Sequence, residues 1–339
     1  IKKYIDAIPG KKTDCTKEHI AFKYRMNIKK NKTYQGEKTT IQEVLGLPGI
    51  GLFRKSKEVD DIRAAIHTAV QCLKRGIQII DPGLEFEWKQ AGSVHEGSKV
   101  NAPDEFDLNC YFVLLATCVE AHSMNDGDPS HLFLKQLGAV PDALKNLFDS
   151  FHGEQCLVLD SLNMRFYSAC QVVLSLKEFW EINNKLMRVE VSDITGYRTG
   201  ISNLLVFWHG EEYPLLEISM DLVPVMKLCK AQYFIPAENI PDSVVAKKIH
   251  YKADKRYIFR TSFNEREGDT MQGIPRTELA KSTYMLCKSL REPAICPVFC
   301  DNPAHHDTTS CTTDCKVYPV SKVITSYMIK NVIFDLHAS

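Results

Sequence analysis

The sequence AGSVHEGSKVNAPDEFDLNCYF, residues Ala91–Phe112, contains the pattern from which the rest of the fold is predicted. Across Glu105–Leu115, apolar and polar residues alternate, which is typical of a strand with one buried and one polar face. Glu105 and Asp107 are two residues apart, so their carboxylates are expected on the same polar face. The preceding Gly92-Ser93 pair is typical of a turn. We therefore expect a turn that leads into a strand with two neighbouring carboxylates.

A third carboxylate is expected on a separate strand. Ile201–Trp208 and Tyr213–Val223 have the pattern of two strands joined by a turn at His209–Glu212, which predicts a β-hairpin. In the second strand apolar residues alternate with Glu217, Ser219 and Asp221, which form the polar row. The sequence thus predicts that Asp221 lies on the polar face of its strand.

Helical patterns occur on both sides of these strands. From Glu58, apolar residues recur at intervals of three and four, which predicts a long helix with one buried face that ends at Gly76. Thr277–Glu292 and Ser321–His337 are the clearest helices after Val225. We therefore predict an α+β fold. Its parts are a basic segment (residues 1–56), a lobe with a mixed β-sheet and the long helix (57–230), and a mainly helical lobe (231–339) with a Cys/His-rich insertion at 296–315.

The composition is that of a folded protein with an uneven charge. Among 339 residues, 42 basic ones balance 42 acidic ones and 44% are hydrophobic, which excludes collagen-like, disordered and small disulfide-stapled classes. Residues 1–56 contain thirteen basic and five acidic residues, so the rest of the chain is acidic by the same excess of eight. The chain therefore has a basic arm on an acidic body, and its net charge of zero does not argue against a polyanionic partner.

Membrane association is not expected, and a reducing compartment is. The longest apolar stretch, Tyr111–Val119, has about half of the ~20 residues that a membrane-spanning helix needs. Cysteines within apolar segments, such as Cys110 and Cys170, are typical of free buried thiols. This scattered placement favours a cytoplasmic protein over a disulfide-stabilised one.

Carboxylates from two strands can form a site for hard divalent cations. Mg²⁺ prefers carboxylate oxygens and substrate phosphates, and ions paired about 3.5–4 Å apart catalyse phosphoryl and nucleotidyl transfer. Backbone N–H groups and the hydroxyl of the Gly92-Ser93 turn can bind a triphosphate. The order of turn, acidic pair and Asp221 favours this interpretation over a merely solvated acidic surface and a plain turn.

Four segments resemble one family. Ala91–Phe112 closely resembles the nucleotidyltransferase signature of the cyclic GMP-AMP synthase (cGAS) and cGAS-like receptor family of Mab-type nucleotidyltransferases. LLEISMDLVPVM (Leu215–Met226) is similar to the segment with that family's third metal-binding aspartate. FRTSFNEREGD (Phe259–Asp269) and TSYMIKNVIF (Thr325–Phe334) resemble its Trp-Arg-Leu-Ser-Phe-Ser segment and its closing Ser-Tyr helix. The resemblance, over roughly residues 58–339, implies a bilobed nucleotidyltransferase fold with a long spine helix.

The resemblance also implies functions for individual residues. Glu105, Asp107 and Asp221 match the triad that binds two Mg²⁺ or Mn²⁺ ions, and Gly92 and Ser93 match the triphosphate-binding turn. The implied nucleotide contacts are Arg260, Ser262, Asn264, Glu267, Ser326 and Tyr327, with Lys281 or Lys288 as a phosphate-binding lysine. Asn264 stands where the family has a serine. A surface charge at Arg260 and a packing role for Tyr327 are the alternatives.

A structural Zn²⁺ site is a further expectation. Vertebrate members of the family carry a zinc-binding His/Cys insertion soon after the segment that matches Phe259–Glu267, but Gly268–Pro275 contains no cysteine or histidine. A later segment has enough ligands for a four-coordinate site. These ligands are Cys296, Cys300, His305, His306, Cys311 and Cys315. A disulfide-paired loop and free surface thiols are the alternatives.

Long nucleic acid activates receptors of this family by binding the spine helix and the adjoining basic surface. The matching basic residues are Lys29, Lys30, Lys57, Arg63, Lys74 and Arg75. Such residues bind phosphates without reading sequence. Double-stranded RNA is the expected ligand, because the resemblance links members without the zinc thumb to RNA sensing. Double-stranded DNA and a merely solvated lysine-rich tail are the alternatives.

The resemblance therefore implies an innate-immune, antiviral enzyme that joins ATP and/or GTP into a cyclic dinucleotide, with dimerisation on nucleic acid as a further expectation. A catalytically silent Mab-type scaffold is a second hypothesis, and the complete carboxylate triad counts against it. A polymerase that tails RNA is a third, and the closing Ser326-Tyr327 helix counts against it.

Overall fold

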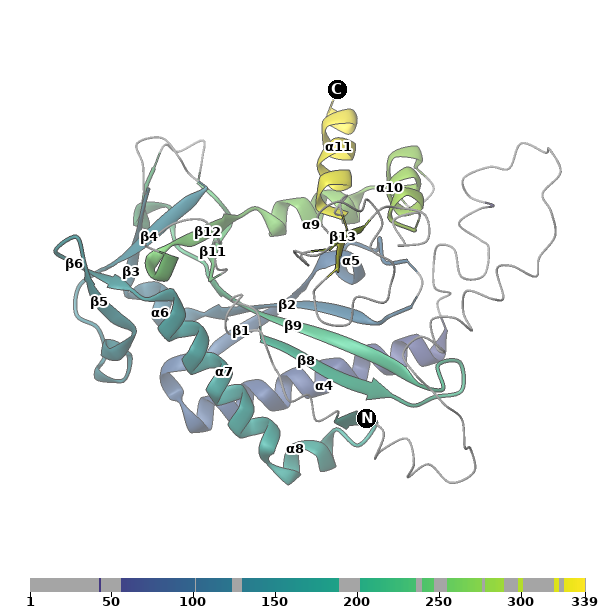
Figure 1. Ribbon diagram of the computed structural model, residues 1–339, viewed down its shortest axis with the longest axis horizontal. Helices are drawn as coiled ribbons and strands as arrows, with labels where there is room; N and C mark the ends of the chain where they lie inside the picture. Colours follow the sequence, from purple (N-terminus) through teal and green to yellow (C-terminus); the bar gives the residue numbers. More distant parts are fainter. Residues whose placement is uncertain are drawn as a thin grey trace. The chain divides into compact units, whose positions relative to one another are not determined.

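The computed structural model describes Glu43 and residues 56–100, 102–123, 130–188, 202–235, 240–246, 255–275, 278–289, 298–300, 320–322 and 326–338 (Figure 1). The chain divides into two compact units. The larger unit consists of Lys55–Glu96 and Pro103–Thr270, and the smaller one includes Gly97–Ala102 and Met271–Ser339. The lobe boundary predicted at residue 230 thus falls within the larger unit.

The long predicted helix is α4, Lys57–Ile80. Ser56 caps its first turn, since the Ser56 hydroxyl accepts a hydrogen bond from the Val59 amide at 3.3 Å, a common N-cap arrangement. The predicted apolar face is buried, from Val59 to Ile77. The predicted end at Gly76 is wrong, because the helix continues to Ile80.

Gly76 lies inside α4, at the point where a second helix crosses it. A Cβ at this position would lie 2.7 Å from both methyl carbons of Val173, which belongs to α7, Leu159–Ser175. Glycine therefore lets the two helices approach closely. The end of α4 is fixed nearby, where Asp81 forms a two-pronged ion pair with Arg165 of α7, with both N–O distances at 2.6 Å.

In the larger unit, twelve strands of the described residues form one mixed sheet. Its main path runs β1-β2-β9-β11-β12-β4-β3-β10, with β8 beside β9, β7 beside β8, and β5 and β6 beside β4. The β2–β9 and β3–β10 pairs are parallel and the other pairs are antiparallel. The strands are β1 Phe86–Ala91, β2 Glu105–Phe112, β3 Val119–Ser123, β4 His131–Gln136, β5 Phe148–Phe151, β6 Glu154–Leu157, β7 Leu186–Arg188, β8 Ser202–Trp208, β9 Leu216–Met226, β10 Tyr233–Phe234, β11 Ser243–Val245 and β12 Phe259–Ser262. The predicted α+β class and mixed sheet are confirmed.

Two predicted strand limits change. β2 ends at Phe112 rather than at Leu115, and α6, Val113–Thr117, follows directly. The predicted hairpin is present as the antiparallel pair β8–β9, but its second strand begins at Leu216 rather than at Tyr213. The connection between the strands is therefore longer than the predicted turn, which changes the residues that face each other.

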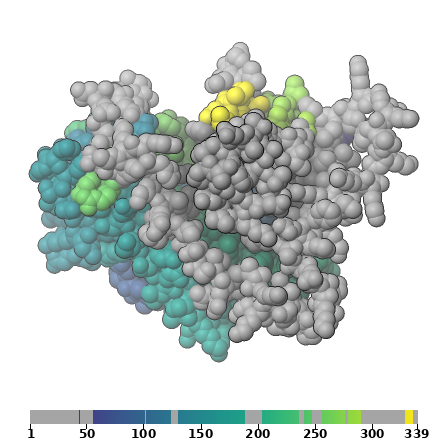
Figure 2. Space-filling model, viewed as in Figure 1, coloured from purple at the N-terminus to yellow at the C-terminus, as the bar shows by residue number. Residues whose placement is uncertain are grey.

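One face of this sheet packs against helices (Figure 1). Apolar side chains of β2, including Phe106 and Leu108, belong to the same buried cluster as Ile66 of α4 and Phe166 of α7. The ring of Phe166 lies edge-on to the ring of Phe112, with centroids 5.2 Å apart. Among the described residues of the larger unit, the other helices before α9 are α5 Gly92–His95, α8 Lys177–Ile182 and the three-ten helices Pro82–Leu84, Asp142–Leu147, Lys230–Gln232 and Lys255–Tyr257. In Figure 2, viewed as in Figure 1, atoms of the segment from β3 to α8 are exposed.

The smaller unit has its own apolar core, in which Val100, Met271, Tyr284 and Ile333 take part. Its described elements are α10 Leu279–Ser289, α11 Ser326–Ala338 and the antiparallel pair β13 Val298–Cys300 and β14 Val320–Lys322. The helix predicted over Ser321–His337 therefore starts later than expected, at Ser326, and Val320–Lys322 form β14. Helix α9, Asn264–Gly273, begins in the larger unit and ends in the smaller one. No helix among the described residues combines the length and apolarity needed to cross a membrane.

Candidate metal and nucleotide site

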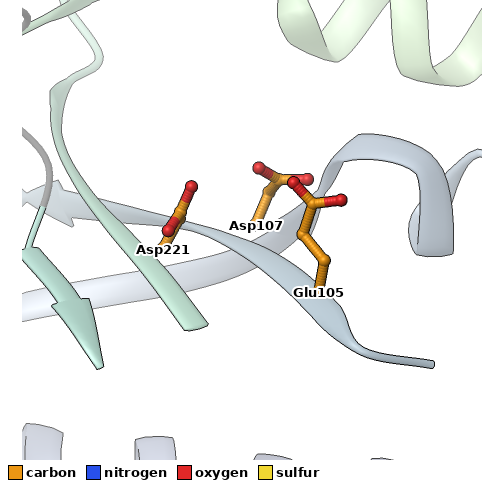
Figure 3. A group of neighbouring side chains, drawn as sticks. All are labelled: Glu105, Asp107 and Asp221. Atoms are coloured by element: carbon orange, nitrogen blue, oxygen red, sulfur yellow. The ribbon is translucent and has the colours of Figure 1, made fainter. Parts of the chain in front are cut away.

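The three predicted carboxylates come together on the face of the sheet opposite the helical core. Parallel pairing of β2 with β9 places Asp107 directly beside Asp221 and Glu105 beside Ser219. One carboxylate oxygen from each of Glu105, Asp107 and Asp221 lies within 4.8 Å of the others. Figure 3 shows all three carboxylates pointing to the same side of the sheet. Three hard oxygen ligands at this spacing match the ligand set that Mg²⁺ and Mn²⁺ prefer.

Gly92 closes one side of this carboxylate group. Ala91, the last residue of β1, pairs with Asp107, and Gly92 follows with a φ of +66°. A Cβ at Gly92 would overlap the carboxylate of Asp107, so the backbone approaches this side chain more closely than any other residue would permit. The buried Ser93 comes next, in the short helix α5. The structure thus brings the predicted Gly-Ser turn against the predicted acidic pair.

Asp221 is held by two polar neighbours, Asn203 and Ser219. Asn203 of β8 lies opposite Asp221 in the hairpin register. Its side-chain amide donates one hydrogen bond to Asp221 Oδ1 and another to Ser219 Oγ, the latter at 2.6 Å. The Ser219 hydroxyl in turn donates to Asp221 Oδ1 at 3.4 Å. The polar row predicted for the second strand already contained Ser219, whereas Asn203 could be found only from the correct register.

The predicted nucleotide contacts on β12 and α9 lie in a part of the larger unit that neighbours the Gly-Ser turn. Ser262 is buried, and its hydroxyl accepts a hydrogen bond from the backbone N–H of Asn264 at 3.3 Å, at the start of α9. Glu267 lies one turn further along α9. A Cβ at Gly268 would be 3.5 Å from the His95 ring, so the first turns of α9 lie close to α5 and its Gly-Ser turn.

Arg260 shares the face of the sheet that carries the triad. Directly paired residues of neighbouring strands lie on one face, and the pairs Tyr111–Val225, Val225–Val245 and Val245–Arg260 form one row across four strands. Tyr111 is four residues after Asp107 on β2, so it lies on the same face. Strands are spaced about 4.8 Å apart, so Arg260 lies roughly 14 Å from β2. The Arg260 side chain is exposed.

A partly buried polar cluster fastens α9 to this face. Glu265 of α9 accepts a hydrogen bond from the Tyr111 hydroxyl at 2.8 Å and forms ion pairs with Lys227 at 2.8 Å and Lys89 at 3.7 Å. Burial raises the pKa of Tyr111. Burial also acts to raise the pKa of Glu265, but hydrogen bonds from Lys227 and Tyr111 outweigh it, so the pKa is lowered. Sequence reasoning missed this cluster, because its members are remote along the chain.

The other predicted nucleotide contacts belong to the smaller unit. The ammonium of Lys281 is buried and donates hydrogen bonds to the carbonyl oxygens of Met271 at 2.6 Å and Ile274 at 2.9 Å, which fastens α10 to the end of α9. Lys288 lies in the last turn of α10. Ser326 and Tyr327 begin α11, but their side chains lie outside the described part of the structure.

The predicted zinc ligands lie almost entirely outside the described residues. Cys296, His305, His306, Cys311 and Cys315 lie outside the described residues. Only the backbone of Cys300 is described, at the end of β13. The cysteines whose side chains are described are free thiols, as the scattered pattern predicted; they are Cys72, Cys110, Cys118, Cys156, Cys170, Cys229 and Cys287.

The predicted nucleic-acid-binding residues are only partly described. Lys29 and Lys30 lie outside the described residues, and the other four are on α4. Lys57 and Arg75 are exposed. Lys74 forms an ion pair with Glu87 at 2.6 Å, and Arg63 lies 3.9 Å from Asp60. Acidic partners therefore offset part of the positive charge of this helix.

No family model matches the chain.

Proposed function

We propose that the protein is a nucleotidyltransferase of the bilobed, cGAS-like type that joins ATP and/or GTP into a cyclic dinucleotide and is activated by double-stranded RNA. The observation that carries this proposal is the carboxylate group of Glu105, Asp107 and Asp221, held within 4.8 Å on two parallel strands. The close approach of Gly92 to Asp107 supports it, because a phosphate-binding turn beside divalent-cation ligands is what nucleotidyl transfer needs.

The donor set fits two divalent cations. Glu105, Asp107 and Asp221 would hold them, since all three are carboxylates and the described residues offer no soft ligand in that group. When bound, such ions activate an attacking hydroxyl and stabilise the leaving oxygen of a phosphate. The chain's own contribution is to fix the three carboxylates in register and, through Gly92, to allow close approach of the backbone to a triphosphate. The Ser93 hydroxyl and neighbouring N–H groups are donors suited to phosphate oxygens.

The wider face offers groups that suit a nucleotide. Arg260, Ser262, Asn264 and Glu267 lie at the junction of β12 with α9, and a guanidinium can stack on a base or bind a phosphate. Of the two candidate lysines, Lys288 stays the predicted phosphate contact, because the buried ammonium of Lys281 already donates to two carbonyl oxygens. Ser326 and Tyr327, also in the smaller unit, stay predicted nucleotide contacts. For the activator, exposed Lys57 and Arg75 would bind the phosphates of RNA, together with Lys29 and Lys30 of the basic arm.

The proposal is tested by incubating the purified protein with all four nucleoside triphosphates, Mg²⁺ or Mn²⁺, and double-stranded RNA or DNA. We expect a phosphatase-resistant cyclic dinucleotide that appears only with RNA, identified by mass spectrometry. Asp107→Asn should abolish synthesis and leave RNA affinity unchanged. A product that appears with DNA alone would identify DNA as the activator. Extended RNA tails would indicate a polymerase. The absence of both product and nucleotide binding would favour a scaffold.

Two further expectations need separate measurements. Metal analysis of the intact protein and of a Cys311→Ser/Cys315→Ser variant tests the proposed structural Zn²⁺, and equal zinc content would exclude these ligands. Mass measurement in solution with and without double-stranded RNA tests whether the protein dimerises on nucleic acid.

A further inference from the structure

We propose that Asn203 is a positioning residue for Asp221, and that Asn203 and Ser219 together set the affinity of the carboxylate group for a divalent cation. The inference rests on the cation site of the proposed function and is independent of the nucleotide chemistry. It concerns a side chain on a third strand, β8, which supplies none of the three carboxylates.

The three side chains form a closed triangle of hydrogen bonds, in which Asn203 and Ser219 both donate to Asp221. A side-chain amide nitrogen has two N–H donors, and Asn203 directs one to Asp221 Oδ1 and the other to Ser219 Oγ. Ser219 accepts that bond and donates its own hydroxyl proton to Asp221 Oδ1. Both neighbours therefore donate to the same carboxylate oxygen.

This arrangement fixes the orientation of the Asp221 carboxylate. Two donors on Oδ1 oppose rotation of the group, and both are neutral, so they hold the ionised carboxylate without cancelling its charge. Outer partners of metal-binding carboxylates commonly act in this way, and their removal typically weakens metal binding or activity about 10–100-fold. The hairpin supplies the required geometry, because Asn203 lies directly across from Asp221 and Ser219 is two residues before it.

A purely structural role for Asn203 predicts something different. Seven cross-strand pairs already hold β8 to β9, from Ser202–Leu222 to Trp208–Leu216, so the amide side chain is not needed for pairing. If Asn203 only filled space, an apolar residue of similar shape would preserve cation binding. Asn203→Leu is therefore the decisive variant, since it keeps a branched side chain and removes both donors.

The experiment measures Mn²⁺ binding by calorimetry in nucleotide-free protein, together with the melting temperature of each variant. Asn203→Leu is expected to weaken Mn²⁺ binding roughly 10–100-fold with little change in melting temperature. Ser219→Ala should weaken it less, because its contact with Asp221 is the longer one, and the double variant should resemble Asn203→Leu since both act on one oxygen. Asp107→Asn is the control that must weaken binding. Glu217→Gln, on the same face of β9, is the matched control for loss of a charge outside the triad.

The outcomes separate this inference from the proposed function. Weaker Mn²⁺ binding by Asn203→Leu supports it, whether or not a cyclic dinucleotide is made. Unchanged binding by Asn203→Leu, beside a loss in Asp107→Asn, overturns it and leaves the proposed function standing. No Mn²⁺ binding by the unmodified protein overturns both. Where synthesis is observed, the Mn²⁺ concentration for half-maximal rate should rise in Asn203→Leu while the rate at saturating Mn²⁺ recovers.

Discussion

The backbone of Gly92 lies against the carboxylate of Asp107 so closely that a Cβ would overlap it. The contact follows from strand register, because Ala91 and Asp107 are paired across β1 and β2 and Gly92 turns away with a positive φ. The Gly-Ser turn and the acidic pair, separated in the sequence, are thus parts of one small structure.

We therefore expect Gly92→Ala to displace Asp107 and to weaken Mn²⁺ binding at least about tenfold, the scale seen when partners of a metal ligand are disturbed. Gly138→Ala is the matched control. Gly138 has a similar φ of +69°, but a Cβ added there would meet no atom within 4 Å, so the variant should lose about 1 kcal/mol of stability from backbone strain alone. Normal Mn²⁺ affinity in Gly92→Ala would contradict the assigned contact.

A second prediction concerns Glu58, which fastens the β8–β9 connection to the start of α4. Its carboxylate accepts hydrogen bonds from the Trp208 indole at 2.9 Å and from the backbone N–H groups of Glu211, Glu212 and Tyr213 at 3.0, 2.7 and 3.0 Å. Because hydrogen bonds to a charged acceptor are the stronger kind, we expect Glu58→Ala to lower the free energy of unfolding by about 2 kcal/mol. Denaturant titration measures this change.

The pH dependence of Glu58 has a definite sign. Partial burial acts to raise its pKa, but the hydrogen bonds from Glu212, Trp208, Tyr213 and Glu211 outweigh it and lower the pKa below the ordinary value of 4.5. A lowered pKa in the folded state contributes stability above the unfolded value, which is lost as pH falls through the folded one. The difference between wild type and Glu58→Ala should therefore be full at pH 7 and shrink below pH 4.5. Asp60→Asn, also in the first turn of α4, should show a much smaller difference, and equal effects would contradict the Glu58 assignment.

A third prediction uses Gly76, where local helix propensity and packing oppose each other. Alanine is favoured over glycine inside a helix by about 1 kcal/mol, so Gly76→Ala would stabilise an isolated α4. Here the added methyl would lie 2.7 Å from Val173, and overpacking of this kind costs about 1–3 kcal/mol. We expect a net loss of unfolding free energy, measured by denaturant titration. Val173→Ala should restore stability in the double variant, and failure to do so would mean that the methyl is accommodated elsewhere.

Patterns local in sequence predicted most of the elements around the site. Alternation in β2 put Glu105 and Asp107 on one face, and the helical period of α4 identified its buried side. Both patterns depend only on which residues lie two, three or four positions apart, so they can be recognised without knowledge of the tertiary structure.

Features set by remote contacts were missed. The shorter predicted turn would place Asn203 opposite Ile218, on the wrong face, whereas the actual connection places it opposite Asp221. The local pattern predicts a helix end at Gly76, because its packing against Val173 is encoded 97 positions away along the chain. The strand Val320–Lys322 depends on pairing with β13, and nothing in its own apolar pattern distinguishes it from the start of α11.

The last prediction concerns Glu265, which holds α9 against the sheet. Its hydrogen bonds with Tyr111 and Lys227, both at 2.8 Å, connect α9 to β2 and to the residue that follows β9. Glu265→Gln removes the charge that pairs with Lys227, so we expect faster hydrogen exchange in the first turns of α9 and a loss of about 1–2 kcal/mol in unfolding free energy. Mn²⁺ affinity should stay unchanged, because Glu265 is outside the carboxylate triad.

Asp269→Asn provides the matched control for this prediction, since Asp269 is an exposed acid on the same helix and its removal should leave exchange in α9 unchanged. The pKa of Glu265 is lowered in the folded state, so the stabilisation it contributes should be complete at neutral pH and disappear as pH falls through that lowered value. Tyr111→Phe should reproduce part of the effect, because it removes one of the donors and leaves the Lys227 ion pair in place. If Glu265→Gln accelerated exchange throughout the sheet as well as in α9, Glu265 would stabilise the whole unit rather than position one helix beside the candidate nucleotide site.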